Sequence, residues 1–185
     1  MTEGAPGQPD SYDIDDLDRA APEAFNAAMS PLFEGAPAFL ARLAAARPFG
    51  SWDALFEAAR RIAQEMPERE QVQLVDAHPR LGAPPGSVSA LSFVEQAYDQ
   101  EEAANVAGEG ERGRIAAKLH YLNAAYEARF GFRYCVFVAG RSRAELIPEM
   151  AAALGREREL ELRRALDAVV DIATDRHWKS STVSG

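Results

Sequence analysis

The 185-residue chain has one cysteine, three histidines and no long uninterrupted apolar run. A single cysteine, Cys135, excludes an intramolecular disulfide, and its YCVFV setting predicts a buried, unreactive thiol. The N-terminal stretch lacks the basic region and apolar centre of a secretory signal, and no apolar run approaches membrane-spanning length. The C-terminal STVSG is not a peroxisomal address. We therefore expect a cytoplasmic protein that does not enter a membrane.

Motifs for nucleotide and metal chemistry are also missing. The chain has no Walker loop, G-x-G-x-x-G, G-x-S-x-G or H-E-x-x-H sequence, and His78, His120 and His177 do not have metal-ligand spacing. Basic residues are in the minority, 20 against 29 acidic ones, for a net charge of -9. Such a charge repels nucleic-acid phosphates. We expect neither a metal nor a nucleotide cofactor, and no nucleic-acid partner.

Apolar residues make up 47% of the chain, and their spacing predicts helices. The Gly- and Pro-rich residues 1–12 predict a disordered tail, followed by one domain at 13–180. We expect an all-α, single-domain helical bundle. Its predicted helical segments begin near Asp15 and Ser30 and then cover residues 39–46, 51–66, 71–78, 93–106, 111–130 and 156–178, with a break at Gly108–Gly110 and a glycine cap at Gly131.

Two segments are ambiguous in sequence. Residues 132–139 form the one continuous apolar and aromatic run, but no second strand is convincing, so we interpret it as extended backbone or a buried helical start. Its amide groups then need side-chain, ligand or water partners. Ser142 and Glu145 match a capping box. Pro148 lies deep for a helix that begins there, so the alternative start is near Pro148 itself.

The stretch AHPRLGAPPGSVSALSFVEQ, residues 77–96, is unusually rich in polar chemistry. Pro79 disfavours helical dihedrals for the residue before it, so His78 is predicted at a helix end. A helix C-terminus favours the imidazolium form. The alternative is that His78 is a cap or surface residue and that Ser92 and Glu95 form an ordinary capping box. By pattern alone the capping interpretation is favoured.

Arg176 has an unusual position in the last predicted helix. It lies three residues after Ala173 and seven after Val169, and so continues the apolar stripe instead of joining the solvated face. An inward-facing arginine needs a partner. A snorkelling cap at the helix end is the competing interpretation, equal in weight to a binding role.

Four sequence segments together resemble the 2-oxo-4-hydroxy-4-carboxy-5-ureidoimidazoline (OHCU) decarboxylase family: RPFGSWDALF, AHPRLG, SFVEQ and LNAAYEARFGF. The resemblance implies an all-helical homodimer that acts on a small-molecule substrate without a cofactor. Its activity would be that of a carboxy-lyase forming (S)-allantoin in urate degradation. By the same resemblance the catalytic residues are His78 and Glu95, and the substrate-binding residues are Pro79, Ser92, Gln96, Phe132 and Arg176.

The chain departs from the family pattern in three places. Arg80 stands where an acidic residue is common, Arg133 replaces the proline of an FGFPF-like segment, and the usual arginine pair of the last helix is reduced to Arg176. These changes are consistent with a lyase for a related anionic ureide, and at Arg80 they are equally consistent with surface drift. A separate alternative, which composition does not exclude, is a non-enzymatic helical binding module in which His78 and Glu95 are caps and Arg176 is an ion-pair partner.

Overall fold

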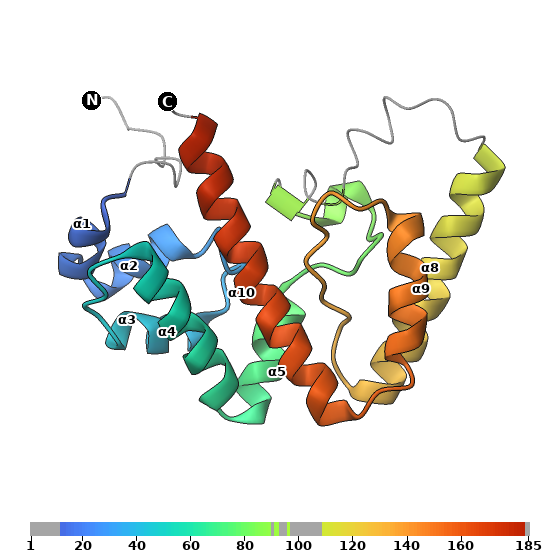
Figure 1. The fold of residues 1–185 in the computed structure, drawn as a ribbon, viewed down its shortest axis with the longest axis horizontal. Coiled ribbons are helices and arrows are strands. Elements are labelled where there is room, and N and C mark those ends of the chain that lie inside the picture. Colours follow the sequence, from blue (N-terminus) through green and yellow to red (C-terminus); the bar gives the residue numbers. More distant parts are fainter. Residues whose placement is uncertain (1–11, 90, 93–95, 97–108, 184–185) are drawn as a thin grey trace. The chain divides into compact units, whose positions relative to one another are not determined.

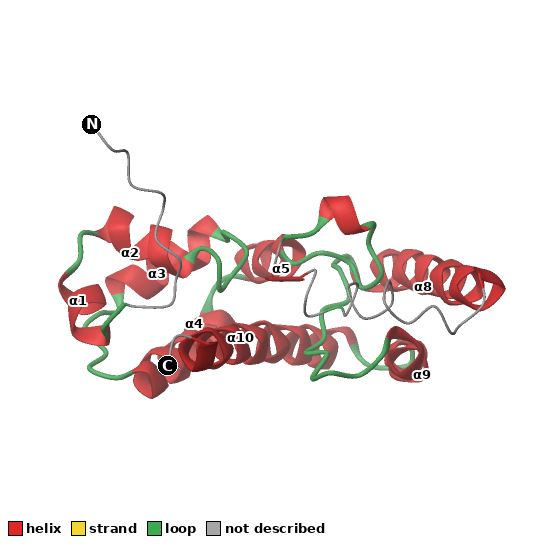
Figure 2. Cartoon of the chain, turned by 90° about the horizontal axis from the view of Figure 1, so that it is seen from above, coloured by secondary structure: helices red, strands yellow, loops and turns green. Residues whose placement is uncertain are grey.

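A computed structural model describes residues 12–89, 91–92, 96 and 109–183. Within these residues every regular element is a helix, which confirms the all-α prediction (Figure 2). The helices are labelled in Figure 1 and have these bounds: α1 Ile14–Arg19, α2 Pro22–Met29, α3 Pro37–Ala45, α4 Trp52–Glu65, α5 Glu68–Ala77, the 3₁₀ turn η2 Pro85–Ser87, α8 Glu109–Phe130, α9 Arg143–Ala153 and α10 Arg158–Val183. No described helix is long and apolar enough to span a bilayer.

The chain forms two compact units. The first unit combines residues 1–74 with 170–185, and the second is 75–169. Both division points fall inside helices, in α5 and in α10, so each of these helices contributes residues to both units. The predicted helix at 156–178 corresponds to α10, and the predicted helix at 71–78 corresponds to α5, which begins earlier, at Glu68.

In the first unit, α3 packs against α2 and α4 (Figure 1). Phe25 and Met29 are buried on one face of α2, as their spacing predicts. Ser51 caps α4 by accepting a hydrogen bond from the Ala54 N–H, which confirms the predicted cap. The apolar face of α4, with Leu55 among its buried residues, follows the expected helical spacing.

The N-terminal helical stretch differs from the prediction. It is two helices, α1 and α2, because Ala20 and Ala21 adopt extended dihedrals. The reason is Pro22, which disfavours helical dihedrals at the residue before it and occupies the first position of α2. The element predicted from Ser30 is a series of turns, and the next helix, α3, begins only at Pro37.

In the second unit, α8 packs against α9, and four aromatic side chains form the centre of the core. The rings of Tyr126, Phe130, Phe132 and Tyr134 lie with centroids 4.6–5.9 Å apart. Gly131, with φ of +78°, ends α8 as predicted. The predicted break at Gly108–Gly110 is wrong for Gly110, which lies in α8, because one glycine costs a long helix only about 1 kcal/mol.

Residues 133–138 have no regular secondary structure, which confirms the extended-backbone interpretation. Their carbonyl groups are held by side chains. Arg164 donates to the Cys135 oxygen at 2.9 Å, and Arg141 donates to the Phe137 oxygen at 2.7 Å and the Val138 oxygen at 3.0 Å. These carbonyl groups of the apolar run are therefore satisfied without a partner strand.

The helix after this segment begins where the capping box predicts. Ser142 and Glu145 bond reciprocally, and α9 continues from Arg143 through Pro148 to Ala153. The alternative start near Pro148 is therefore wrong. The missing proline N–H removes one helical hydrogen bond, whereas the capping box satisfies two groups at the helix start.

Candidate active site

His78 lies directly after the C-terminus of α5, as predicted, and only 4% of its surface is exposed. Its backbone N–H donates to the Val75 carbonyl at 3.1 Å, which extends the last turn of α5 by one residue. Its carbonyl accepts from Arg133 at 3.1 Å. The burial of His78 excludes the alternative that it is a surface residue.

The loop that continues from His78 is held through its backbone. The Leu81 carbonyl accepts from Asn123 at 3.0 Å, and the Gly82 N–H donates to the Gln96 side chain at 2.8 Å. Gly82 has φ of +76°, a left-handed conformation that strains any other residue, and a Cβ atom there would also lie 2.8 Å from the end of the Leu119 side chain. The turn formed by AHPRLG is thus held by hydrogen bonds to Asn123 of α8 and to Gln96.

Arg80, the first departure from the family pattern, forms an ion pair. Its guanidinium contacts both carboxylate oxygens of Glu127 on α8, with Nη2 2.7 Å from Oε2. The pairing lowers the pKa of Glu127 and raises the pKa of Arg80, in each case chiefly through the shared hydrogen bond. Arg80 therefore connects the turn to α8, and its fork is already occupied by protein.

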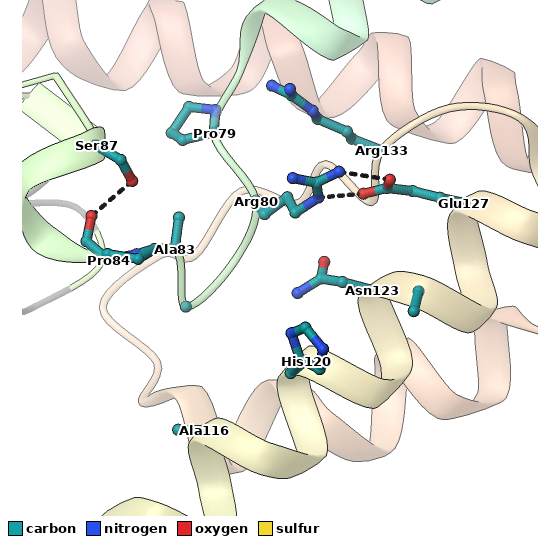
Figure 3. A pocket seen from close by; sticks show the side chains of 12 residues that line it. Pro79, Arg80, Ala83, Pro84, Ser87, Ala116, His120, Asn123, Glu127 and Arg133 are labelled. Carbon is teal, nitrogen blue, oxygen red and sulfur yellow. Dashed lines mark hydrogen bonds and ion pairs between the residues drawn. The ribbon is translucent and has the colours of Figure 1, made fainter.

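A pocket of about 510 Å³ opens between this turn and α8 (Figure 3). Asn123, His120 and Glu127 line it from α8, and Arg133 lines it from the extended segment. Of the predicted site residues that the structure describes, only Pro79 belongs to its lining. His78, Ser92, Gln96, Phe132 and Arg176 are not among the residues that line it.

Ser92 and Gln96 are both buried, as a site role requires. The Ser92 N–H donates to the Ser89 hydroxyl at 3.2 Å. The predicted capping box of Ser92 and Glu95 stays a prediction, because Glu95 lies outside the described residues. Gln96 donates its backbone N–H to the Ser92 carbonyl at 3.0 Å, while its side chain holds Gly82. Glu95 lies outside the described residues, and so does the helix predicted from Phe93, apart from Gln96.

Phe132 and Arg176 belong to different compact units. Phe132, in the second unit, is 1% exposed and belongs to the aromatic core. Arg176, in the first unit, is 4% exposed, which confirms its inward direction. Its guanidinium pairs with Glu34 at 2.7 Å and donates to the Pro31 carbonyl at 2.8 Å. The convergence of His78, Glu95 and Arg176 on one pocket stays a prediction.

Sequence reasoning missed the residues that hold the loop, among them Asn123. Asn123 is 7% exposed and continues the apolar stripe of α8, four residues after Leu119 and three before Tyr126. An amide on a buried stripe signals a specific hydrogen-bond partner. That signal was present in the sequence, although the identity of the partner, the Leu81 carbonyl, was not. Among the described residues no group of three or more His, Cys, Asp or Glu side chains is arranged to hold a metal ion.

The fold is that of a known class of helical enzymes. A crystal structure of an OHCU decarboxylase, determined in the presence of (S)-allantoin, matches 88% of this chain and 99% of its own, with a TM-score of 0.64 and 18% identity. A crystal structure of an (S)-allantoin synthase matches 90% of this chain and 53% of its own, with a TM-score of 0.60 and 17% identity. The OHCU decarboxylase family model matches residues 18–177, and the chain belongs to that family.

Sequence relatives agree with this assignment. A 2-oxo-4-hydroxy-4-carboxy-5-ureidoimidazoline decarboxylase of Haloferax volcanii is 27% identical over 160 residues, which cover 86% of this chain and 90% of the relative. The uric acid degradation bifunctional protein PucL of Bacillus subtilis is 27% identical over 162 residues. That match covers 88% of this chain but 31% of PucL, so the chain spans about a third of the bifunctional relative.

Proposed function

We propose that the chain decarboxylates OHCU to (S)-allantoin in urate degradation, without a cofactor. The observation that carries the proposal is the family match over residues 18–177, which includes the buried His78 at the end of α5. In this reaction the bond from C4 to the carboxylate breaks and carbon dioxide leaves. The electron pair enters the adjacent unsaturated ring, and a proton delivered to one face sets the configuration of the product.

Each proposed site residue has a role that suits its chemistry. His78 transfers the proton, because an imidazole titrates near working pH. Glu95 orients His78 or the substrate hydroxyl. Arg176 binds a planar oxygen group through its guanidinium fork. Ser92 and Gln96, with Pro79 and Phe132 beside them, shape the surroundings of the ring and the ureido group.

The departures from the family pattern support OHCU itself over a different anionic ureide. Both new cations are engaged with protein groups: Arg80 with Glu127, and Arg133 with the carbonyls of Asp76 and His78. These contacts give each of the two arginines a structural role that needs no change of substrate. A related anionic ureide therefore remains only the second candidate.

The decisive experiment adds the purified chain to freshly generated OHCU and follows the ultraviolet absorbance and circular dichroism. We expect decay faster than the spontaneous reaction and accumulation of a single enantiomer, (S)-allantoin. Decay at the spontaneous rate, or a racemic product, would contradict the proposal. The same assay with a related anionic ureide as substrate tests the second candidate.

The assembly and location of the enzyme are part of the same proposal. We infer a homodimer of the 20.1 kDa chain, located in the cytoplasm, with residues 13–180 as one folding domain. Sedimentation equilibrium should give twice the chain mass. Thermal unfolding should show a single transition, because α5 and α10 each contribute residues to both compact units.

A further inference from the structure

The guanidinium of Arg133 holds the end of the helix that presents His78. Its Nη1 atom donates to the Asp76 carbonyl at 2.6 Å and to the His78 carbonyl at 3.1 Å. The last carbonyls of a helix lack intrahelical partners, and a cation at this end also complements the helix dipole. Arg133 therefore satisfies two acceptors that α5 cannot satisfy by itself.

The contact is reciprocal. The backbone N–H of Arg133 donates to the Asp76 carboxylate at 2.8 Å, while the Arg133 side chain donates back to the Asp76 carbonyl. Both the backbone N–H and the side chain of Arg133 thus bind the same helix end. A proline at this position, the residue usual in the family, could form neither contact, because it has no N–H and no cationic side chain.

The consequence for His78 is that both of its peptide groups are held. On one side its N–H donates to Val75 within the last turn of α5, and on the other its carbonyl accepts from Arg133. With both peptide groups held, the direction of the bond from Cα to Cβ is set, and only the side-chain torsions of His78 remain. Misplacement of a catalytic group by about 1 Å can lower a rate by about a hundredfold.

We propose that Arg133 is a positioning residue for His78, acting through the His78 carbonyl and the end of α5. This inference rests on the proposed function, in which His78 transfers the proton. In this role Arg133 acts through His78 and not on the substrate, so its removal should slow the chemical step and leave binding unchanged.

The test compares Arg133→Met, Arg133→Lys and a control, Arg47→Met, in steady-state decarboxylation of OHCU. Methionine keeps an unbranched stem and the backbone N–H but removes every guanidinium donor. Arg47 is a matched control because it donates to three backbone carbonyls, those of Leu17, Ala20 and Ala44, in the first unit. Arg133→Met should lower kcat about tenfold to a hundredfold with KM unchanged. Arg133→Lys should recover part of the loss, and Arg47→Met should lower Tm while kcat is kept.

A double variant separates positioning from a general effect on the fold. In a His78→Ala background, Arg133→Met should cause no further loss of kcat, because the group that Arg133 positions is absent. The inference is overturned if Arg133→Met alone keeps wild-type kcat, or if it lowers kcat in the His78→Ala background by the same factor as in the wild type.

A second readout does not depend on turnover. Diethyl pyrocarbonate modifies accessible imidazoles, and the modification of His78 can be followed by mass spectrometry. Arg133→Met should accelerate it, whereas Arg47→Met should not; an unchanged rate in Arg133→Met overturns the positioning role. Failure of the wild-type chain to accelerate OHCU decay would instead overturn the proposed function, so the two failures are distinguishable.

Discussion

The buried Arg176 and the partly buried Glu34 form an ion pair in the first unit, with Nη2 of the arginine 2.7 Å from Oε1 of the glutamate. Glu34 has φ of +51°, a left-handed conformation that is strained for a residue other than glycine. Arg176 also donates to the carbonyls of Pro31 and Leu32 in the same turn. One arginine thus holds a strained turn and is also proposed to bind substrate.

These two roles of Arg176 can be separated by two variants. Glu34→Gln leaves the arginine intact but removes the carboxylate that pairs with it, and should destabilise the fold by about 3 kcal/mol, because the buried Arg176 loses its charged partner. Its KM should change little. Arg176→Lys keeps the charge but loses the planar fork, so KM should rise in addition to any loss of stability. Urea unfolding and steady-state kinetics on both variants provide the measurement. If Arg176→Lys has the same, nearly unchanged KM as Glu34→Gln, Arg176 is a structural residue only.

Replacing His78 by alanine should lower kcat by about two to four powers of ten while the helical circular dichroism is retained. The expected loss follows from removal of the proton-transfer group. The control is His120→Ala, which removes an exposed imidazole from α8 and should keep wild-type kcat. Full stereospecific activity in His78→Ala would refute the assignment at its centre.

Glu95→Gln should reduce turnover strongly without unfolding the protein. Glutamine keeps the size of the side chain and much of its capping capacity but removes the negative charge that the chemistry requires. Kinetics and thermal unfolding, measured on the same preparation, separate the two effects. If turnover stays near wild type, Glu95 is a cap and not a catalytic group.

Because of Glu161, the stability of the second unit should depend on pH in the acidic range. It is fully buried, accepts from Tyr126 at 2.8 Å, and pairs with Arg156 and Arg164. Burial alone would raise the pKa of Glu161, but the hydrogen bond and charge of Arg164 outweigh burial and lower it. Because the pKa of Glu161 is lower in the folded than in the unfolded state, its contribution to the free energy of unfolding is complete above the unfolded pKa of about 4.3. This contribution disappears as the pH falls through the folded pKa.

Glu161→Gln tests this dependence. At pH 7 the variant should lose about 3–5 kcal/mol of unfolding free energy, because two arginines lose a buried partner. The difference from wild type should shrink as the pH falls below about 4. Glu159→Gln, which disrupts only the exposed pair with Arg163 on the same helix, should change stability little. A loss in Glu161→Gln that is independent of pH would show that packing, not charge, is responsible.

Prolonged treatment with EDTA should leave the turnover of OHCU unchanged. The expectation follows from the cofactor-free reaction and from a sequence whose three histidines lack metal-ligand spacing. The measurement is kcat before and after chelation and gel filtration. Loss of activity that is restored by adding a divalent metal would refute the cofactor-free mechanism.

Much of the fold was predictable because helix signals are local. Ser51 caps α4, Gly131 ends α8 and the Ser142 capping box begins α9, and each of these signals involves residues within four positions of one another. Part of the site was predictable for the same reason: Pro79 next to His78 marks a helix end. The predictions that were wrong concerned boundaries: the stretch from Asp15 is two helices that divide before Pro22, the element from Ser30 is a series of turns, and Gly110 lies inside α8. At Pro22 and Gly110 the local penalty of one residue competes with the helix beside it.

The sequence by itself determined the helical periods, the position of His78 at a helix end and the inward direction of Arg176. Only the tertiary structure decided what the arginines do. From sequence alone, Arg80 was equally consistent with surface drift or a changed substrate, and Arg133 was only a departure from the family pattern. Their acceptors, Glu127 for Arg80 and the carbonyl of His78 for Arg133, lie 47 and 55 residues away along the chain. Guanidinium donors can pair with any nearby carboxylate or carbonyl, so composition and spacing do not specify the partner; the folded backbone does.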